Sequence, residues 1–286
     1  MMKKIILGLV ALCCALSASA AERLVVAGGS LTELVYAIGA GDRVVGVDET
    51  TSFPPETADL PHIGYWKQLS SEGILSLRPD SVITWQDAGP SLVLEQLRTQ
   101  KVKVLTLPRV PATVEQMYAN IHTLSAALGE QQKGDELVSS LRQRLETVAL
   151  RNAQMKPVNA LFILSAGGSA PQVAGQGSVA DAIMTLAGAH NAAQHSQYKG
   201  YSAEALIAAN PDVIVVTSQM VQGDLNRLAA IAGITHTTAW KNQRIITVDQ
   251  ALILGMGPRI ADAVETLHQQ FWPREGKTEP VQPTWI

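Results

Sequence analysis

Short runs of β-branched and aliphatic residues alternate along most of this chain with segments whose apolar residues recur at helical spacing. Such periodicity is the main signal that separates strands from helices. It predicts strands at residues 24–26, 44–47, 81–84, 102–107, 160–164, 213–217 and 244–247. It predicts helices at residues 31–38, 71–77, 91–99, 114–128, 179–187, 203–209, 225–231 and 260–270. Strands separated by helices in this way indicate parallel βαβ units.

One long helical pattern, at residues 132–154, interrupts this alternation. It carries the regularly spaced apolar residues Leu137, Leu141, Leu145 and Val148. A helix of this length spans about 30 Å. We therefore expect an α/β fold of two Rossmann-like lobes with parallel-type sheets, residues 21–131 and 157–272, joined by one backbone helix at residues 132–156.

Residues 70–84 match residues 202–216 at a constant offset. Ser70, Glu72, Pro79 and Asp80 correspond to Ser202, Glu204, Pro211 and Asp212. In both copies a capped helix ends at Pro-Asp and leads into an apolar strand. Two homologous lobes explain this match better than chance similarity of two βα units. Since open parallel sheets bind ligands at the carboxyl ends of their strands, we expect a ligand cleft between the lobes.

The N-terminus has the three parts of a secretory signal peptide. Two lysines precede an apolar run at residues 5–16, and Ala18-Ser19-Ala20 supplies small residues for cleavage. The run is shorter than the roughly 20 residues that span a bilayer. We expect removal of residues 1–20, export of a soluble protein to the periplasm, and a loosely ordered, proline-containing tail at residues 273–286.

Composition narrows the function further. Both cysteines, Cys13 and Cys14, lie in the predicted leader, so a mature chain without it has no disulfide, thiol nucleophile or cysteine-ligated metal. The formal net charge is −3 and no basic run occurs, which speaks against a nucleic-acid partner. The chain has no Gly-x-Ser-x-Gly or HExxH motif, so we expect a protein that is not an enzyme. An exported hydrolase with a site assembled in space remains an alternative.

The most informative stretch is Gly64-Tyr65-Trp66-Lys67. Aromatic residues make up 5% of the chain, so two adjacent ones between a strand and a helix stand out. They either pack the loop onto the core or face the cleft as a site for a flat aromatic ligand. Tyrosinate is a known axial ligand of haem iron, and the nearby Lys67 cation favours the phenolate form.

Residues 64–77 resemble the haem-ligating segment of periplasmic haem-transport binding proteins, which belong to the cobalamin- and siderophore-binding class of ABC importers. That family typically has Gly-Tyr, two further residues and Leu-Ser-Ala-Glu-Gly; here Leu69, Ser70, Glu72 and Gly73 match the second part. The resemblance extends over nearly all of the mature chain, including residues 27–33 and 254–259. Members often carry Arg two residues after the Tyr, where this chain has Lys67.

The resemblance implies that the protein captures ferric haem b between its lobes. Tyr65 would be the axial metal ligand, with Trp66 and Lys67 as further haem contacts. The protein would act as a monomer and deliver haem to an ABC permease in the inner membrane, with an outer-membrane haem receptor upstream. Another iron chelate, such as a siderophore, or a corrinoid is the alternative ligand.

Two further residues are candidates for haem contacts. Arg259 follows Gly257-Pro258 at a predicted helix start, where backbone N–H groups and a cation make an anion site. It would bind a haem propionate or form a structural ion pair. Tyr201, in the second lobe's counterpart of the Tyr65 loop, would cover the other haem face or pack that loop.

Glu72 and Glu204 occupy equivalent positions in the repeat. Acidic residues are favoured in the first turn of a helix by its dipole, which explains both without a further role. In the family that the chain resembles, one acidic residue on each lobe docks onto arginines of the permease. The resemblance implies this docking role for Glu72 and Glu204.

Overall fold

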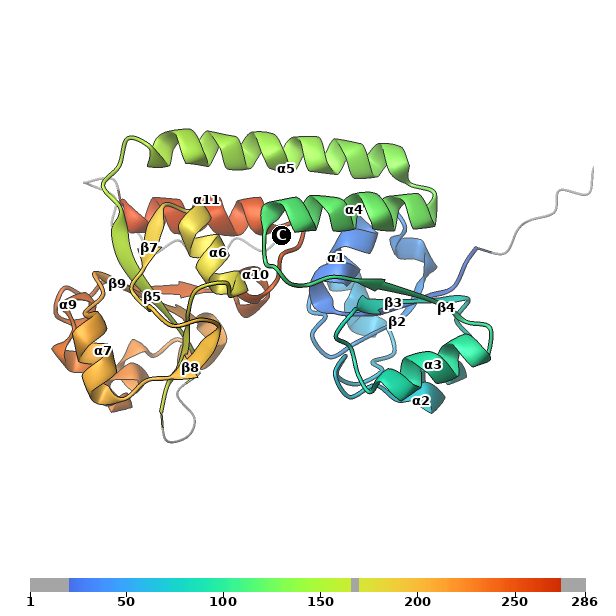
Figure 1. Ribbon diagram of the computed structural model, residues 1–286, viewed down its shortest axis with the longest axis horizontal. Helices are drawn as coiled ribbons and strands as arrows, with labels where there is room; N and C mark the ends of the chain where they lie inside the picture. The colour runs from blue at the N-terminus through green and yellow to red at the C-terminus, as the bar shows by residue number, and fades with distance from the viewer. Residues whose placement is uncertain (1–20, 166–169, 274–286) are drawn as a thin grey trace, which may run out of the picture.

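The structure, a computed structural model, describes residues 21–165 and 170–273, so the predicted leader and nearly all of the predicted tail lie outside the described residues. Two sheets lie under the opposite halves of one long helix, α5 (Gln131–Asn152) (Figure 1). The helix has 22 residues and is therefore about 33 Å long. Within the described residues, none of the helices combines the length and apolar character needed to cross a bilayer.

The N-terminal sheet is parallel, in the order β2-β1-β3-β4. Its strands are β1 (Leu24–Ala27), β2 (Val44–Val47), β3 (Ser81–Trp85) and β4 (Lys103–Leu107). Between them lie α1 (Gly29–Ala37), α2 (Ser71–Ser76), α3 (Ser91–Thr99) and the 3₁₀ helices η1 (Gly41–Arg43) and η2 (Pro55–Asp59). The central strands β1 and β3 are buried along their whole length, as expected for a sheet covered on both faces. We call this part the N-lobe.

The second sheet belongs to the C-lobe and has the order β10-β9-β5-β6-β8, with β7 paired to β5 beside this path. Its strands are β5 (Val158–Ser165), β6 (Gln172–Ala174), β7 (Ala189–Asn191), β8 (Tyr198–Gly200), β9 (Val213–Thr217) and β10 (Ile245–Val248). Its helices are α6 (Val179–Leu186), α7 (Ala203–Ala209), α8 (Ser218–Val221), η3 (Leu225–Ala230), η4 (Ile234–His236), α9 (Thr238–Lys241) and α10 (Gln250–Leu254).

Three helices connect the lobes into one body. α5 packs against α4 (Val114–Leu128) and α11 (Ile260–Phe271), which lie beneath it over the N-lobe and C-lobe respectively (Figure 1). One contiguous apolar core contains Val25 of β1, Leu145 of α5, Phe162 of β5 and Leu267 of α11. The two sheets therefore share a core through the helical layer.

The sequence repeat corresponds to a structural repeat. Ser70 and Ser202 cap α2 and α7 by accepting hydrogen bonds from the amides of Gly73 and Ala205. Arg78 and Asn210, at equivalent positions after these helices, both have left-handed backbone conformations, with φ of 50° and 35°. The carboxylates of Asp80 and Asp212 each accept a hydrogen bond from a backbone amide at or just before the neighbouring strand, those of Arg23 and Asn159. Two βα units that agree in cap, turn and strand entry support the prediction of two related lobes.

The predicted α/β fold is confirmed, with a correction to the second sheet. β6 pairs antiparallel with β5 and β8, so the C-lobe sheet is mixed and not purely of the parallel type. The sequence pattern missed β6, β7 and β8 because three residues are too few to show a period and their pairing depends on tertiary contacts. The helix predicted at residues 225–231 is the short 3₁₀ helix η3.

Candidate ligand-binding site

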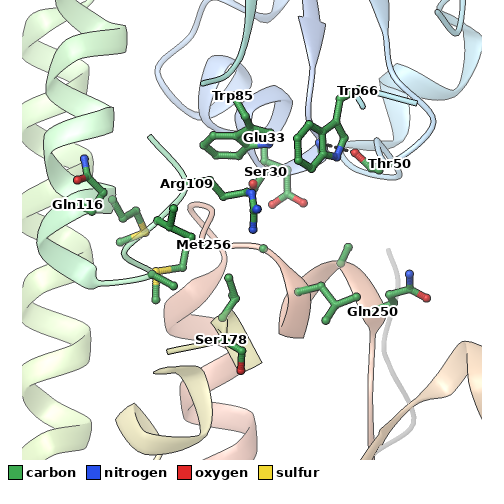
Figure 2. Close-up of a pocket in the computed structure, with 18 of the residues that line it drawn as sticks. Ser30, Glu33, Thr50, Trp66, Trp85, Arg109, Gln116, Ser178, Gln250 and Met256 are labelled. Carbon is green, nitrogen blue, oxygen red and sulfur yellow. Dashed lines mark hydrogen bonds between the residues drawn. The ribbon is translucent and has the colours of Figure 1, made fainter. Parts of the chain in front are cut away.

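A cavity of about 730 Å³ opens between the two lobes (Figure 2). Its size is typical of pockets for small molecules and cofactors. The N-lobe and α4 contribute one wall, which includes Ser30, Tyr65, Trp66, Lys67, Trp85, Arg109, Gln116 and Met117. The C-lobe contributes the facing wall, which includes Leu164, Ser178, Val179, Tyr198, Gln219, Gln250, Leu254 and Met256. The predicted position of the cleft at the lobe junction agrees with this cavity.

The two adjacent aromatic residues Tyr65 and Trp66 differ in burial. Gly64 has a φ of 87°, a backbone conformation that residues with a Cβ atom rarely adopt. Trp66 is 8% exposed and packs in the core, whereas Tyr65 is 37% exposed. Both line the cavity, and their rings meet edge to face with centroids 5.6 Å apart. Among the described residues, none hydrogen-bonds to the Tyr65 hydroxyl, so its oxygen is available to a ligand.

Backbone hydrogen bonds hold this segment in place. The Glu49 amide donates to the Gly64 carbonyl at 3.0 Å, and the Gln68 amide donates to the Tyr65 carbonyl at 2.7 Å. The Gly89 amide donates to the Trp66 carbonyl at 3.1 Å. Tyr65 therefore projects from a turn whose backbone is tied to two neighbouring loops.

A cluster of two cations and one carboxylate lies beside Trp66. Arg109 Nη2 donates to Asp87 Oδ2 at 2.8 Å, and Lys67 Nζ lies 3.8 Å from the same oxygen. Lys67 Nζ and Arg109 Cζ lie 4.9 Å and 5.4 Å from the centroid of the Trp66 ring, within the range of cation–π attraction. Burial raises the pKa of Asp87, but the hydrogen bond and charge of Arg109 outweigh it, and with Lys67 they leave the pKa below its ordinary value.

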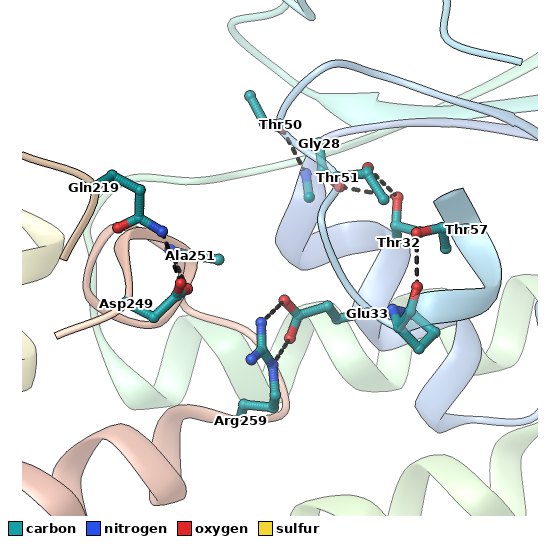
Figure 3. Close-up of polar contacts among 12 residues, drawn as sticks. Gly28, Thr32, Glu33, Thr50, Thr51, Thr57, Gln219, Asp249, Ala251 and Arg259 are labelled. Carbon is teal, nitrogen blue, oxygen red and sulfur yellow. Dashed lines mark hydrogen bonds and ion pairs between the residues drawn. The ribbon is translucent and has the colours of Figure 1, made fainter. Parts of the chain in front are cut away.

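Two glycines allow the start of α1 to approach the cavity wall closely. A Cβ atom on Gly28 would lie 2.6 Å from Trp85 Nε1, and one on Gly29 would lie 2.3 Å from the Thr50 carbonyl oxygen. The Gly28 amide donates to the buried Asp48 carboxylate at 3.0 Å. Burial raises the pKa of Asp48 although hydrogen bonds from Thr50, Gly28 and Thr51 act against it. This network lies at the start of α1, and Figure 3 shows its members Gly28, Thr50 and Thr51.

Arg259, a predicted propionate contact, is engaged in an ion pair with Glu33. Its Nε and Nη2 donate to the two carboxylate oxygens at 2.8 and 2.5 Å (Figure 3). The Arg259 and Glu33 side chains are only 15% and 6% exposed. Glu33 borders the cavity, whereas Arg259 is not among its lining residues. The structure thus agrees with the ion-pair interpretation of Arg259, which the sequence left open beside the anion site.

The C-lobe aromatic residue at the cavity is Tyr198, and not the predicted Tyr201. Tyr198 lines the cavity, and burial raises the pKa of its phenol to about 12 although the Arg109 charge acts against this. The Tyr201 hydroxyl lies 3.1 Å from Nδ1 of His195, whose Nε2 lies 3.1 Å from the Val173 carbonyl oxygen. The Tyr201 ring packs against the C-lobe core, away from the cavity lining.

Glu72 and Glu204 are both exposed, in the first turns of α2 and α7. These helices lie at the lower ends of the two lobes, on the side of the molecule opposite α5 (Figure 1). The Glu204 backbone amide and the Ser202 hydroxyl hydrogen-bond to the Glu204 carboxylate and hold its pKa below the ordinary value. Each lobe therefore presents one carboxylate on the same side of the molecule.

Sequence reasoning missed Trp85 and Arg109 as cavity residues. Trp85 ends β3, and Arg109 follows β4 by two residues. Both thus occupy the carboxyl edge of a parallel sheet, where ligands bind. The rule that predicted the cleft could therefore have identified them, had it been applied to each strand end.

Comparison with known proteins gives consistent matches over most of the chain. Residues 24–252 match the family described as "Periplasmic binding protein". The apo form of the periplasmic heme-binding protein RhuT from Roseiflexus sp. RS-1 is 35% identical, with a TM-score of 0.84 over 88% of this chain and 98% of that one. A periplasmic heme-binding protein from Pseudomonas aeruginosa is 36% identical, with a TM-score of 0.82 over 88% and 93%. The vitamin B12-binding protein of Yersinia pestis is 26% identical over 262 residues, 90% of this chain and 88% of the relative.

Proposed function

Because this chain belongs to the periplasmic binding protein family, we propose that it captures ferric haem b in the interlobe cavity and delivers it to an ABC permease of the inner membrane. In this role it acts in the periplasm as a monomer and binds its ligand without chemical conversion. An outer-membrane haem receptor would supply the ligand. The heme-binding structures at 35 and 36% identity support haem as the first candidate.

The single observation that carries the proposal is the position of Tyr65. The residue is 37% exposed and lines the cavity, and no described residue hydrogen-bonds to its hydroxyl group. A phenolate oxygen is a hard donor that suits ferric iron, and tyrosinate serves as an axial haem ligand in proteins. Tyr65 would therefore bind the iron from the N-lobe side.

The remaining cavity walls fit the faces of a porphyrin. Trp66 and Trp85 line the cavity on the N-lobe side with the 8% and 6% of their surface that remains exposed. Apolar side chains on the other walls include Met117, Leu164, Val179, Leu254 and Met256. Burial of a flat apolar macrocycle between such surfaces is favoured by the hydrophobic effect. Lys67, beside Trp66, is placed to contact the porphyrin edge.

Delivery to the permease would use the side of the molecule opposite α5. Helices α2 and α7 lie on that side, one in each lobe, and Glu72 and Glu204 are exposed in their first turns. Carboxylates at an interface steer association with a basic partner surface and fix its register. One carboxylate per lobe would let the permease hold both sides of the cavity mouth.

A corrinoid is the second candidate ligand. The vitamin B12-binding relative matches 90% of the chain. Amide side chains also line the cavity, namely Gln116, Asn120, Gln197, Gln219 and Gln250. Amides pair well with the amide groups at the edge of a corrin ring.

Absorbance titration with haemin and, in parallel, with cyanocobalamin tests the proposal. We expect saturable haemin binding with a high-spin ferric spectrum, and loss of the phenolate-dependent band in the Tyr65→Phe variant. Tyr36→Phe is the matched control, because Tyr36 lies in α1 outside the cavity lining. Saturable binding of cyanocobalamin without haemin binding would contradict the proposal and favour the corrinoid.

A further inference from the structure

We infer that Arg109 binds a carboxylate at the edge of the ligand, so that the cavity selects a haem with free propionates. This inference rests on the proposed function of the same cavity. Nothing in the sequence pattern or in the family match assigns a role to Arg109; the sequence predicts a propionate contact for Arg259 and a haem contact for Lys67.

The position of Arg109 is that of a ligand contact. The residue follows β4, and its guanidinium projects from the N-lobe wall toward the C-lobe (Figure 2). Its Cζ lies 5.4 Å from the centroid of the Trp66 ring, so it stands next to the aromatic wall that includes Tyr65. A porphyrin bound by Tyr65 would thus present one edge to this cation.

The hydrogen bonds of Arg109 are incomplete. Nη2 donates to Asp87, while Nε is buried without a partner among the described residues. By contrast, Arg259 and Arg144 each use both Nε and Nη2 on carboxylates. A guanidinium has five N–H donors in a planar fork that matches a carboxylate. Arg109 therefore keeps Nη1, which has no acceptor among the described residues, for a ligand, whereas the buried Nε could reach one only if the side chain moved.

The charges around the cavity also favour an anion at this point. Among the described lining residues, Lys67 and Arg109 are the only cationic side chains. Asp87 neutralises one of these two charges, which leaves a net positive charge beside Trp66. Two carboxylates also line the cavity, namely Glu33, which is paired with Arg259, and Glu49, which is exposed. The two haem propionates are anions of the required kind.

Arg109 is better suited to this carboxylate contact than Arg259 or Lys67. Arg259 is bonded through two nitrogens to Glu33, so it could reach a ligand only by breaking a buried pair. Lys67 is a flexible point charge, 47% exposed, and cannot form a bidentate pair. Arg109 is held over Trp66 and is 33% exposed, so less motion is lost when a carboxylate binds.

The test compares haemin with its propionate dimethyl ester, titrated by absorbance into the wild-type protein, Arg109→Gln and Arg98→Gln. Arg98 is an exposed arginine of α3 outside the cavity lining, so its variant removes the same charge from the same lobe. We expect wild type to bind haemin at least 10-fold more tightly than the diester. Arg109→Gln should weaken haemin binding by about 10-fold to 100-fold, the range for a charge-assisted hydrogen bond, and leave diester binding unchanged. Arg98→Gln should keep the wild-type preference.

The outcomes separate this inference from the proposed function. If wild type binds haemin and the diester equally well, no carboxylate is recognised and the inference is overturned, while haem binding stands. The same holds if Arg109→Gln weakens both ligands by one factor. The wild-type comparison needs no variant, so misfolding of Arg109→Gln would leave a decisive result. If wild type binds neither porphyrin, the proposed function fails first.

Discussion

Glu33 in α1 and Arg259 at the start of α11 form a bidentate ion pair between residues 226 positions apart in the chain. The pair joins the first helix of the N-lobe to the last helix of the molecule, at the edge of the cavity (Figure 3). The Arg259 guanidinium also lies 4.1 Å from the centroid of the Phe53 ring. Helices α1 and α11 are thereby linked through a buried ion pair in addition to the shared apolar core.

Loss of one partner of this pair should destabilise the fold strongly. Arg259→Gln leaves the Glu33 carboxylate buried without its cation, and we expect a loss of about 3–5 kcal/mol in the free energy of unfolding. Arg144→Gln is the control, because Arg144 pairs with Asp262 and Glu265 at a more exposed site and should lose about 1 kcal/mol or less. Urea denaturation measures both. Equal losses in the two variants would show that burial of the Glu33–Arg259 pair adds nothing.

A methyl group at Gly29 should disturb the cavity wall. The Cβ atom of Gly29→Ala would lie 2.3 Å from the Thr50 carbonyl oxygen, so the backbone must shift, at a cost of about 1–3 kcal/mol. Gly73→Ala makes the same change in α2, where the nearest atom is 3.9 Å away, and should stabilise by about 0.5–1 kcal/mol. Thermal unfolding of the two variants should therefore move in opposite directions. A Gly29→Ala midpoint at or above that of wild type would refute the steric explanation.

The phenol of Tyr198 should ionise at a higher pH than an ordinary tyrosine. Burial raises its pKa from 10.0 to about 12, so the folded chain holds this proton more tightly than the unfolded chain. The contribution of Tyr198 to stability is consequently complete below pH 10 and is lost as the pH rises toward 12. Carbon-13 NMR of the tyrosine Cζ atoms measures this pKa, and the Tyr198→Phe variant assigns the resonance.

The same titration tests the proximity of Arg109 to Tyr198. The Arg109 charge lowers the Tyr198 pKa, so Arg109→Gln should raise it further. A Tyr198 resonance that ionises near pH 10, or one unaffected by Arg109→Gln, would contradict the arrangement of these two side chains across the cavity.

Permease docking predicts a transport defect that is separate from ligand binding. Glu72 and Glu204 lie outside the cavity lining, so the double variant Glu72→Ala/Glu204→Ala should bind haem like wild type. Haem uptake with the cognate permease reconstituted in vesicles should fall at least 10-fold, because both carboxylates would contribute to the docked complex. Glu146→Ala removes an exposed carboxylate from α5, on the opposite side, and should transport normally. Unimpaired uptake by the double variant would remove both residues from the docking surface.

The local pattern of apolar residues was sufficient for most of the architecture. Helix α3, helix α4 and strand β9 have the predicted bounds, and α5 begins and ends within two residues of the predicted helix. These elements repeat one period over many residues, and their side chains bury one face or two. Such periodicity is a property of the chain itself, and it also exposed the repeat of α2-β3 in α7-β9.

Other features depended on contacts between distant segments. The three-residue strands β6, β7 and β8 form because neighbouring strands supply their hydrogen bonds. The hydrophobic periodicity of the sequence therefore does not predict them. A helix start and an arginine suggested an anion site at Arg259, but the fold places the Glu33 carboxylate there first. Likewise, only the fold decides that Tyr198 faces the cavity while Tyr201 pairs with His195.

The sequence by itself determined the βα alternation and the long connecting helix, because both follow from the order of neighbouring residue types. The tertiary structure decided which cations keep hydrogen-bond donors for a ligand. Arg259 is neutralised by a residue 226 positions away, while Arg109 lies beside Trp66 with unused donors. Whether a charged side chain meets a ligand or a partner within the fold depends on what packing brings within about 3 Å of it, and a linear pattern does not contain that distance.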